Sequence, residues 1–345
     1  MLIRNRIKKW CVCILLLLFS SQNLPAQCQV LDLSAWVAEW EMKSGLYEAG
    51  SNINIFSSFQ IFAVYFDEND EPMLSSNLKE WLNDAAKWLA ANGNPELYLT
   101  VVNDYKREKE VIYKDPNLVW RFLATQESRA KHLETILGLI DLGPFTGIDL
   151  DYERVKPSDW SVYLKFCEDL HHALNSRGKK LRVVLEPKRE YYTAPFPEGP
   201  EYVVMAYNLF GLHTKVPGPK ADPKFIVNLA RLCRSQMKQL PRFAMATGGF
   251  LWRGDGKIEG HNERKMMEIA RQERVTPVRD ENSQYLVLTY PVKGKNDVGW
   301  FADGVTLEYV METARMEGFE TFALWRLGGN KASSLLRLQM NNRSR

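Results

Sequence analysis

Short apolar runs rich in β-branched and aromatic residues alternate with longer helix-like segments along this 345-residue chain. This alternation is typical of βα units around a parallel sheet, because each crossover between parallel strands has room for a helix. Eight strand-like runs predict one α/β domain, a single (β/α)8 TIM barrel. The expected strands are 35–40, 58–66, 97–102, the acidic stretch 145–153, 181–185, 202–207, 243–247 and 321–324.

Helices are expected between these strands, and one connection is unusually long. The helix-like segments are 78–92, 121–139, 157–176, 223–240 and 307–317. From Leu251 to about Asp303 the pattern changes to polar, glycine-punctuated segments with one strand-like piece, Tyr285–Tyr290. We therefore expect an insertion between strands seven and eight, over one end of the barrel.

The first 26 residues differ from the rest of the chain. Four basic residues precede an apolar run from Trp10 to Phe19, and small residues follow up to Ala26. This order is typical of a secretory signal peptide, and the apolar run is short for a bilayer span. We expect cleavage after Ala26, a mature domain 27–345, secretion or a periplasmic location, and no stable membrane insertion. An uncleaved N-terminal membrane anchor is the alternative.

Removal of the signal changes the charge. The full chain has 45 basic and 42 acidic residues, a formal charge of +3, and four of the basic residues lie in the signal. The mature chain is therefore close to neutral, which gives no indication of a nucleic-acid partner. The substrate is expected to be uncharged, or charged only in parts that the binding site does not mainly recognise.

Cysteine and histidine usage predicts neither a disulfide framework nor a metal centre. Cys28, Cys167 and Cys233 remain after cleavage, an odd and sparse set. The histidines show no metal-ligand spacing with cysteines or acids. These residues therefore give no reason to expect a cofactor or a metal.

Three carboxylates in the fourth expected strand are the strongest indication of chemistry. Asp149, Asp151 and Glu153 occupy positions i, i+2 and i+4, with apolar residues between them. Successive strand side chains point to opposite faces, so the three acids share one face. If the strand is covered on both sides, burial and crowding raise the carboxyl pKa values, and an acid can remain protonated and donate a proton.

Two other interpretations of these acids stay open from the residues alone. The acidic face of the strand can be solvated, which is the commonest fate of alternating charge. The three carboxylates can also bind Ca²⁺ or Mg²⁺, because hard cations prefer oxygen ligands.

The acidic stretch resembles the signature of a known family. Glycoside hydrolase family 18, which includes chitinases and endo-β-N-acetylglucosaminidases, carries D-G-hydrophobic-D-hydrophobic-D-x-E on the fourth strand of a TIM barrel. Residues Gly147–Glu153 match this pattern from the glycine onward. Thr146 stands where the family usually has its first aspartate, a supporting position.

Other segments between Ala35 and Gly329 resemble the same family. Met205–Asn208 is similar to its Met-x-Tyr-Asp at the end of strand six, with Asn208 replacing the aspartate. Phe322–Gly329 resembles its last strand, whose tryptophan lies under the reacting sugar. Three further segments are similar to the spore-germination and cortex-lytic branch: Trp36–Trp40, Phe62–Phe66 and Val298–Asp303.

The resemblance implies a β-glycosidase for N-acetylglucosamine glycans with substrate-assisted, retaining catalysis, an exception to the two-carboxylate scheme. Glu153 would protonate the glycosidic oxygen, and Asp151 would hold the substrate's acetamido N–H. Asp149 would tune Asp151. Tyr207 would orient the acetamido carbonyl, the nucleophile, while Trp325 would stack beneath the ring.

Barrel active sites lie at the carboxyl ends of the strands. Candidate sugar-binding residues there are Asn208, Trp325, Trp40 and Asn103. The glycan stays open among chitin, peptidoglycan and protein-linked N-glycans. A chitinase-like lectin, which binds such glycans without cleaving them, is the alternative function. A metal-dependent hydrolase ranks below it because no histidine ligands accompany the acids.

Overall fold

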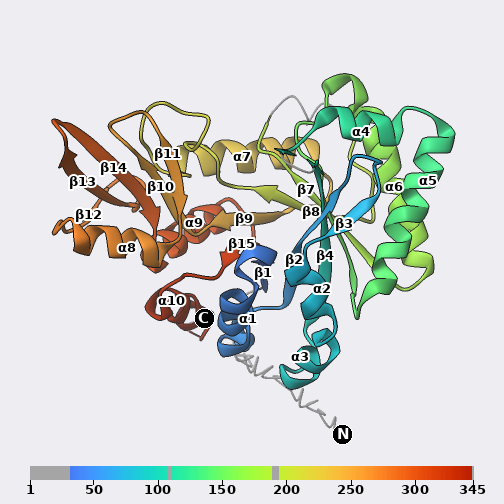
Figure 1. The fold of residues 1–345 in the computed structure, drawn as a ribbon, viewed down its shortest axis with the longest axis horizontal. Coiled ribbons are helices and arrows are strands. Elements are labelled where there is room, and N and C mark those ends of the chain that lie inside the picture. Colours follow the sequence, from blue (N-terminus) through green and yellow to red (C-terminus); the bar gives the residue numbers. More distant parts are fainter. Residues whose placement is uncertain (1–31, 108–109, 189–193, 344–345) are drawn as a thin grey trace, which may run out of the picture.

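The computed structural model describes residues 32–107, 110–188 and 194–343 (Figure 1), so the expected signal peptide and Cys28 lie outside the described residues. One sheet contains eight parallel strands that close into a barrel, because β2 pairs with β1 and β4 and β15 pairs with β1. The predicted TIM barrel is confirmed. In pairing order its strands are β1 (Asp32–Ala38), β2 (Ser58–Phe66), β4 (Glu96–Lys106), β6 (Gly147–Asp151), β7 (Lys180–Leu185), β8 (Glu201–Met205), β9 (Arg242–Ala246) and β15 (Thr321–Leu327).

Two short strands, β3 (Pro72–Leu74) and β5 (Val111–Ile112), add antiparallel edges to β2 and β4. Helices connect the strands. They are α1 (Met42–Ser51), α2 (Ser76–Leu82), α3 (Ala85–Ala91), α4 (Pro116–Leu123), α5 (Gln126–Leu139), α6 (Trp160–Ser176), α7 (Pro223–Gln236), α9 (Gly304–Met316) and α10 (Ala332–Arg343), with 3-10 turns η1 (Glu39–Glu41), η2 (Ile53–Ile55), η3 (Ile140–Leu142) and η4 (Pro157–Asp159). In the part of the chain described here, no helix has the length and apolar character of a membrane span.

Two of the predicted helices are each divided in two. The segment 78–92 contains most of α2 and all of α3, and the segment 121–139 contains the end of α4 and all of α5. In the second case Thr125 caps α5, because its side chain accepts from the Ser128 amide while the Ser128 side chain accepts from the Thr125 amide. This capping box begins a new helix inside a continuous helical pattern.

The long connection after β9 forms a second, antiparallel sheet beside the barrel (Figure 1). Only its strand at Tyr285–Tyr290 was expected from the sequence. The connection contains β10 (Gly248–Trp252), β11 (Ile258–His261), α8 (Glu263–Gln272), β12 (Val278–Arg279), β13 (Leu286–Val292) and β14 (Lys295–Ala302). We call these elements the insertion.

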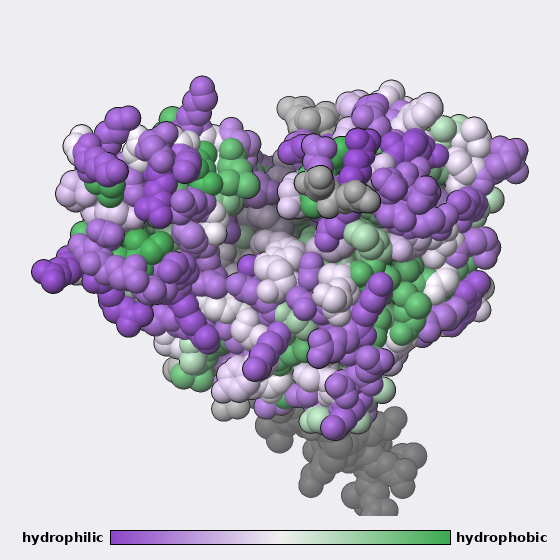
Figure 2. All heavy atoms as spheres, viewed as in Figure 1, coloured by the Kyte–Doolittle hydropathy of each residue, from purple (hydrophilic) through white to green (hydrophobic). Residues whose placement is uncertain are grey.

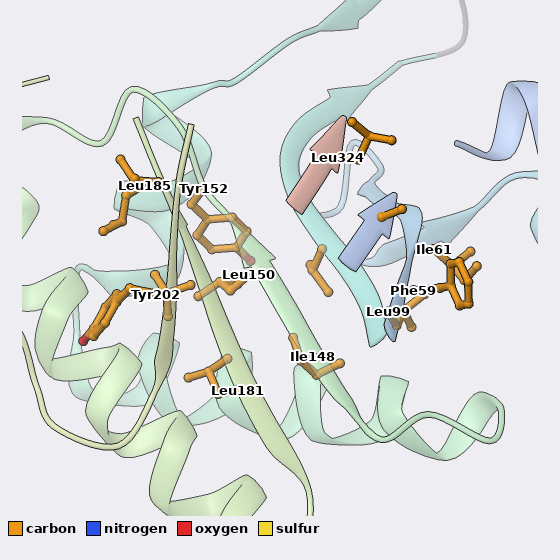
Figure 3. Packing of buried hydrophobic residues seen from close by; sticks show 14 of the residues in the cluster. Phe59, Ile61, Leu99, Ile148, Leu150, Tyr152, Leu181, Leu185, Tyr202 and Leu324 are labelled. Carbon is orange, nitrogen blue, oxygen red and sulfur yellow. The ribbon is translucent and has the colours of Figure 1, made fainter. Parts of the chain in front are cut away.

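Apolar residues form one core between the barrel and its helices and a smaller one inside the barrel. The even-numbered side chains of β6 and its continuation, Ile148, Leu150 and Tyr152, belong to the outer core (Figure 3). Trp36 and Tyr207 belong to the inner cluster. The alternation along β6 therefore leaves the odd-numbered side chains facing the barrel interior.

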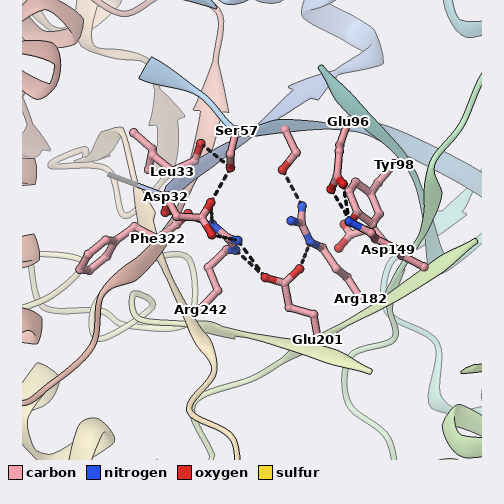
Figure 4. A network of polar contacts seen from close by, with 12 residues as sticks. Asp32, Leu33, Ser57, Glu96, Tyr98, Asp149, Arg182, Glu201, Arg242 and Phe322 are labelled. Carbon is pink, nitrogen blue, oxygen red and sulfur yellow. Dashed lines mark hydrogen bonds and ion pairs between the residues drawn. The ribbon is translucent and has the colours of Figure 1, made fainter. Parts of the chain in front are cut away.

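Two buried arginines form ion pairs with partly exposed acids and connect four barrel strands near their amino-terminal ends (Figure 4). Arg242 on β9 bonds Asp32 on β1 at 2.9 Å and Glu201 on β8 at 2.8 Å, and Arg182 on β7 also bonds Glu201. Breaking one partner of such a pair leaves an uncompensated buried charge. This network therefore lies at the amino-terminal end of the barrel. Active sites of such barrels lie at the opposite end, where the strands terminate.

Candidate active site

A cavity of about 560 Å³ lies at the carboxyl ends of the barrel strands. Seen as spheres, the molecule is hollowed between the insertion and the barrel (Figure 2). The cavity is within the size range of ligand pockets. Its lining includes Asp151, Glu153, Tyr207, Asn208, Trp40 and Trp325.

Local backbone packing explains the residues that begin the acidic stretch. A Cβ atom at Gly147 would lie 2.4 Å from the carbonyl oxygen of Lys180, so only glycine allows β6 and β7 to approach this closely. The Thr146 hydroxyl accepts from the Leu97 amide at 3.2 Å, so the residue at the family's first aspartate position binds the backbone of β4.

Asp149 lies beneath the cavity rather than in its lining. It is fully buried, and its Oδ2 accepts from Trp36 Nε1 at 2.8 Å and from Thr100 Oγ1 at 2.9 Å. Burial raises the pKa of Asp149 to about 6, although both donors oppose that rise. Asp149 can therefore gain or lose its proton near neutral pH, and the charge beside Asp151 changes when it does.

Asp151 ends β6 and reaches the cavity. Burial, and then the negative charge of Glu153, raise the pKa of Asp151 well above its usual value. Its Oδ1 is buried and has no hydrogen-bond partner among the described residues. A buried acceptor without a donor is costly, so a ligand N–H or O–H at this oxygen would be stabilising.

Glu153 follows the strand by two residues instead of lying within it. Asn103 fixes it there: the Glu153 amide donates to Asn103 Oδ1 at 2.9 Å, and Asn103 Nδ2 donates to the Glu153 carbonyl at 2.8 Å. The side chain still lines the cavity with Asp151. Burial raises the pKa of Glu153, the property required of a proton donor at neutral pH.

Lys114 forms an ion pair with Glu153, and no motif in the sequence pointed to this contact. Lys114 lies between β5 and α4 with a left-handed φ of 55°, and its amide donates to Asp104 Oδ1 at 2.8 Å. Asn103 also donates to the Asp115 carbonyl at 3.2 Å. One asparagine therefore positions both the acid and the turn that carries its cationic partner.

Tyr207 and Asn208 lie just beyond β8, which ends at Met205 rather than at Tyr207 as expected. Burial, and then the charges of Asp151 and Glu153, raise the pKa of Tyr207, so its hydroxyl stays protonated. Asn208 has a left-handed φ of 75°, which asparagine tolerates better than most residues, and it also lines the cavity.

Two tryptophans contribute to the cavity from different elements. Trp325 on β15 packs edge-on against Trp36 and Phe62, with ring centroids 5.9 and 4.8 Å apart. Trp40 was expected at the end of a strand, but β1 ends at Ala38 and Trp40 lies in η1. Trp40 is 48% exposed and packs edge-on against Phe62, with the two ring centroids 5.6 Å apart.

The structure brings six of the eight predicted site residues into the cavity lining and places Asp149 and Asn103 behind them. Asn103 uses its amide on backbone atoms of Glu153 and Asp115, which makes it a positioning residue in this structure. Within the described residues, no cluster of three or more histidine, cysteine or acidic side chains is arranged to hold a metal ion.

The sequence was compared with models of protein families and with individual known proteins. No model of a protein family matches the chain. An uncharacterized glycosylase of Bacillus subtilis, YvbX, is 21% identical over 253 residues, which are 68% of this chain and 71% of that protein.

Solved structures are similar over nearly the whole described chain. The spore cortex-lytic enzyme SleL of Bacillus cereus has a TM-score of 0.75 at 17% identity, covering 90% of this chain and 74% of that one. A chitinase of Chromobacterium violaceum has a TM-score of 0.76 at 14% identity, covering 91% and 99%. The resemblance to glycoside hydrolase family 18 is therefore confirmed at the level of the fold, which this chain shares with chitinases and cortex-lytic enzymes.

Proposed function

We propose that this protein is a glycoside hydrolase that cleaves β-linked N-acetylglucosamine glycans with retention of configuration. The observation that carries the proposal is the pair of buried carboxyl groups, Asp151 and Glu153, in one cavity with Tyr207 and Trp325. Burial favours the protonated form of a carboxyl group, so the pair can hold the proton that glycosidic cleavage needs.

In the first step, Glu153 transfers its proton to the glycosidic oxygen and the bond from that oxygen to the sugar C1 breaks. The acetamido carbonyl oxygen of the same sugar forms a new bond to C1, giving an oxazolinium ion. Asp151 accepts a hydrogen bond from the acetamido N–H and stabilises the positive charge there, since its Oδ1 lacks another partner. The Tyr207 hydroxyl donates to the acetamido carbonyl and holds it below C1.

In the second step, water attacks C1 and the carbon–oxygen bond to the acetamido group breaks. The Glu153 carboxylate accepts the proton of this water and regains the acid form. Trp325 offers an aromatic face at the cavity wall, where the apolar face of a pyranose ring can stack. Two displacements at C1 restore the original anomeric configuration.

The second candidate function is a lectin that binds the same glycans, favoured by Thr146 and Asn208, which depart from the family pattern. Incubation with chitooligosaccharides, peptidoglycan and a high-mannose glycoprotein distinguishes the two functions. New reducing ends from at least one glycan support the hydrolase. Binding without cleavage of any of them, in a protein with intact Glu153, would support the lectin.

The first 26 residues support a further proposal, that the protein is exported and cleaved after Ala26. Mass spectrometry of the protein recovered from its native location tests it. A mature chain beginning at residue 27 is expected, and an intact N-terminus would instead support the uncleaved anchor.

Tyr207→Phe is expected to lower kcat, because the lost hydroxyl no longer orients the acetamido carbonyl as charge develops. The matched control is Tyr202→Phe, since the Tyr202 hydroxyl donates to the Pro197 carbonyl at 2.9 Å outside the cavity. Each variant should lose about 1 kcal/mol of stability or less. Unchanged kcat in Tyr207→Phe with a lowered Tm would remove Tyr207 from the reaction.

Lys114→Met is expected to move the alkaline limb of the kcat/KM profile to higher pH. The Lys114 ammonium lowers the pKa of Glu153, opposing its burial, so removal of that ammonium raises this pKa further. Glu153 would then keep its proton to higher pH, and the pH profile of the free enzyme reports this. Lys131→Met, which removes an exposed pair with Glu71, is the control. An alkaline limb that does not move in Lys114→Met would contradict the account.

A further inference from the structure

A second hollow, of about 460 Å³, adjoins the active-site cavity. The two spaces share Trp40 and Trp325 in their linings, so they meet at these tryptophans. Part of the lining comes from the insertion, through Phe250 on β10 and His261 on β11. A glycan bound in the cavity can continue into this hollow, which we call the side pocket.

The side pocket is lined by basic side chains that differ in how their charge is compensated. Three of them each contact an acidic partner: Arg326 with Glu41, Lys265 with Glu268, and His261 with Glu259. The fourth is Lys220, for which no acidic partner occurs among the described residues.

Lys220 lies in the loop between β8 and α7 and is only 9% exposed. Its Nζ donates to the carbonyl oxygen of Thr247 at 2.8 Å and lies 5.1 Å from the ring centroid of Phe250. Both contacts are to neutral groups. Burial, and then the charge of Arg326, lower the pKa of Lys220 to about 7. An anion beside this amine would favour its charged form and recover part of the cost of burying it.

The position of Lys220 connects it to the cavity. The Thr247 amide donates to the Trp325 carbonyl at 2.6 Å, while the Thr247 carbonyl accepts from Lys220. One residue therefore links the amine to the tryptophan proposed to lie under the reacting sugar. The proton donor Glu153 lines only the cavity, not the side pocket.

We propose that the side pocket binds a carboxylate on the glycan, carried by a sugar next to the N-acetylglucosamine at the cleavage site, with Lys220 as its counter-ion. A single uncompensated amine matches a single negative charge, which favours a carboxylate over a doubly charged phosphate. The inference rests on the proposed hydrolase function and narrows its substrates to acidic glycans. The carboxylate belongs either to a uronic acid or to a lactyl ether of an amino sugar.

The test compares oligosaccharides that differ only in this charge. N-acetylglucosamine alternating with glucuronic acid provides one acidic ligand, and N-acetylglucosamine alternating with N-acetylmuramic acid provides the other. Each is also prepared with its carboxylates reduced to alcohols. Affinity is measured calorimetrically in the Glu153→Gln background, so the result does not depend on turnover. The variants are Lys220→Met and, as a matched control, Lys265→Met, whose lysine is exposed and paired.

Lys220→Met is expected to weaken binding of one acidic ligand by roughly ten- to a hundred-fold, the range for a hydrogen bond to a charged group. Binding of the reduced ligand, and binding by Lys265→Met, should change little. Methionine also removes the hydrogen bond to the Thr247 carbonyl, so Tm is measured to establish that the variant is folded before affinities are compared. The acidic ligand that responds identifies the source of the carboxylate.

Equal affinity of the unsubstituted side pocket for acidic and reduced forms of both ligands would overturn the proposal. Equal losses for acidic and reduced ligands in Lys220→Met would do the same, because they would indicate a structural lysine. Cleavage of neutral chitooligosaccharides together with either outcome would leave the proposed hydrolase function intact. If acidic ligands bind through Lys220 but no glycan is cleaved, the proposed role of the side pocket would stand. The proposed hydrolase function would then be wrong.

Discussion

Replacing Glu153 with glutamine is expected to lower kcat by roughly two to four orders of magnitude, the usual contribution of general acid catalysis. Glutamine keeps the size of the side chain and can still form hydrogen bonds, but its amide is too weak an acid to protonate the leaving oxygen. The Lys114 partner of Glu153 loses its negative neighbour, while the backbone bonds to Asn103 remain. Folding and glycan affinity should therefore survive.

Glu263→Gln is the matched control for this substitution. Glu263 is also a buried glutamate whose pKa is raised by burial, but it bonds the Lys331 amide and Ser334 outside the cavity. It should change stability more than kcat. Steady-state rates and Tm measured on both variants separate the two effects. Full activity in Glu153→Gln would exclude Glu153 as the proton donor.

Substrates that lack the N-acetyl group at the cleaved sugar are expected to resist hydrolysis. With a free 2-amine or a 2-hydroxyl group, no carbonyl oxygen is present to attack C1, so Asp151 and Tyr207 have nothing to orient. A thiazoline analogue of the oxazolinium ion should inhibit competitively, since a mimic of the intermediate resembles the flanking transition states.

Matched aryl glycosides of N-acetylglucosamine, glucosamine and glucose provide the measurement, with initial rates and thiazoline inhibition read on one preparation. The glucoside and glucosaminide should show rates near background. Comparable cleavage of all three, without inhibition by the thiazoline, would indicate that a second carboxylate of the protein is the nucleophile.

The barrel and the direction of its acids were predictable because they depend on local periodicity. Alternation along 147–153 places Ile148 and Leu150 in the outer core and Asp151 in the cavity, as period two requires. Strand ends were less predictable. Glu153 and Tyr207 lie past the ends of β6 and β8, because hydrogen bonds between neighbouring strands, rather than side-chain type, determine where a strand stops.

Long-range partners could not be predicted. Lys114 and Glu153 are far apart in sequence, and a lone lysine in a turn carries no motif that relates it to the acid. No motif around Lys220 predicts its burial either, because its contacts are with Thr247 and with Phe250 of the insertion. The insertion after strand seven was expected, but most of its elements were not: β10, β11, β12, β14 and α8 are short and lie in a polar, glycine-punctuated stretch that shows little apolar periodicity.

The anomer formed first during cleavage shows whether C1 undergoes two displacements, as the proposed mechanism requires, or one. Proton nuclear magnetic resonance during the first minutes of hydrolysis distinguishes the two anomers of the new reducing end before they interconvert. We expect the β anomer to appear first and the α anomer to follow by mutarotation. Initial release of the α anomer would mean that water attacks C1 directly, and would contradict the mechanism proposed for Glu153, Asp151 and Tyr207.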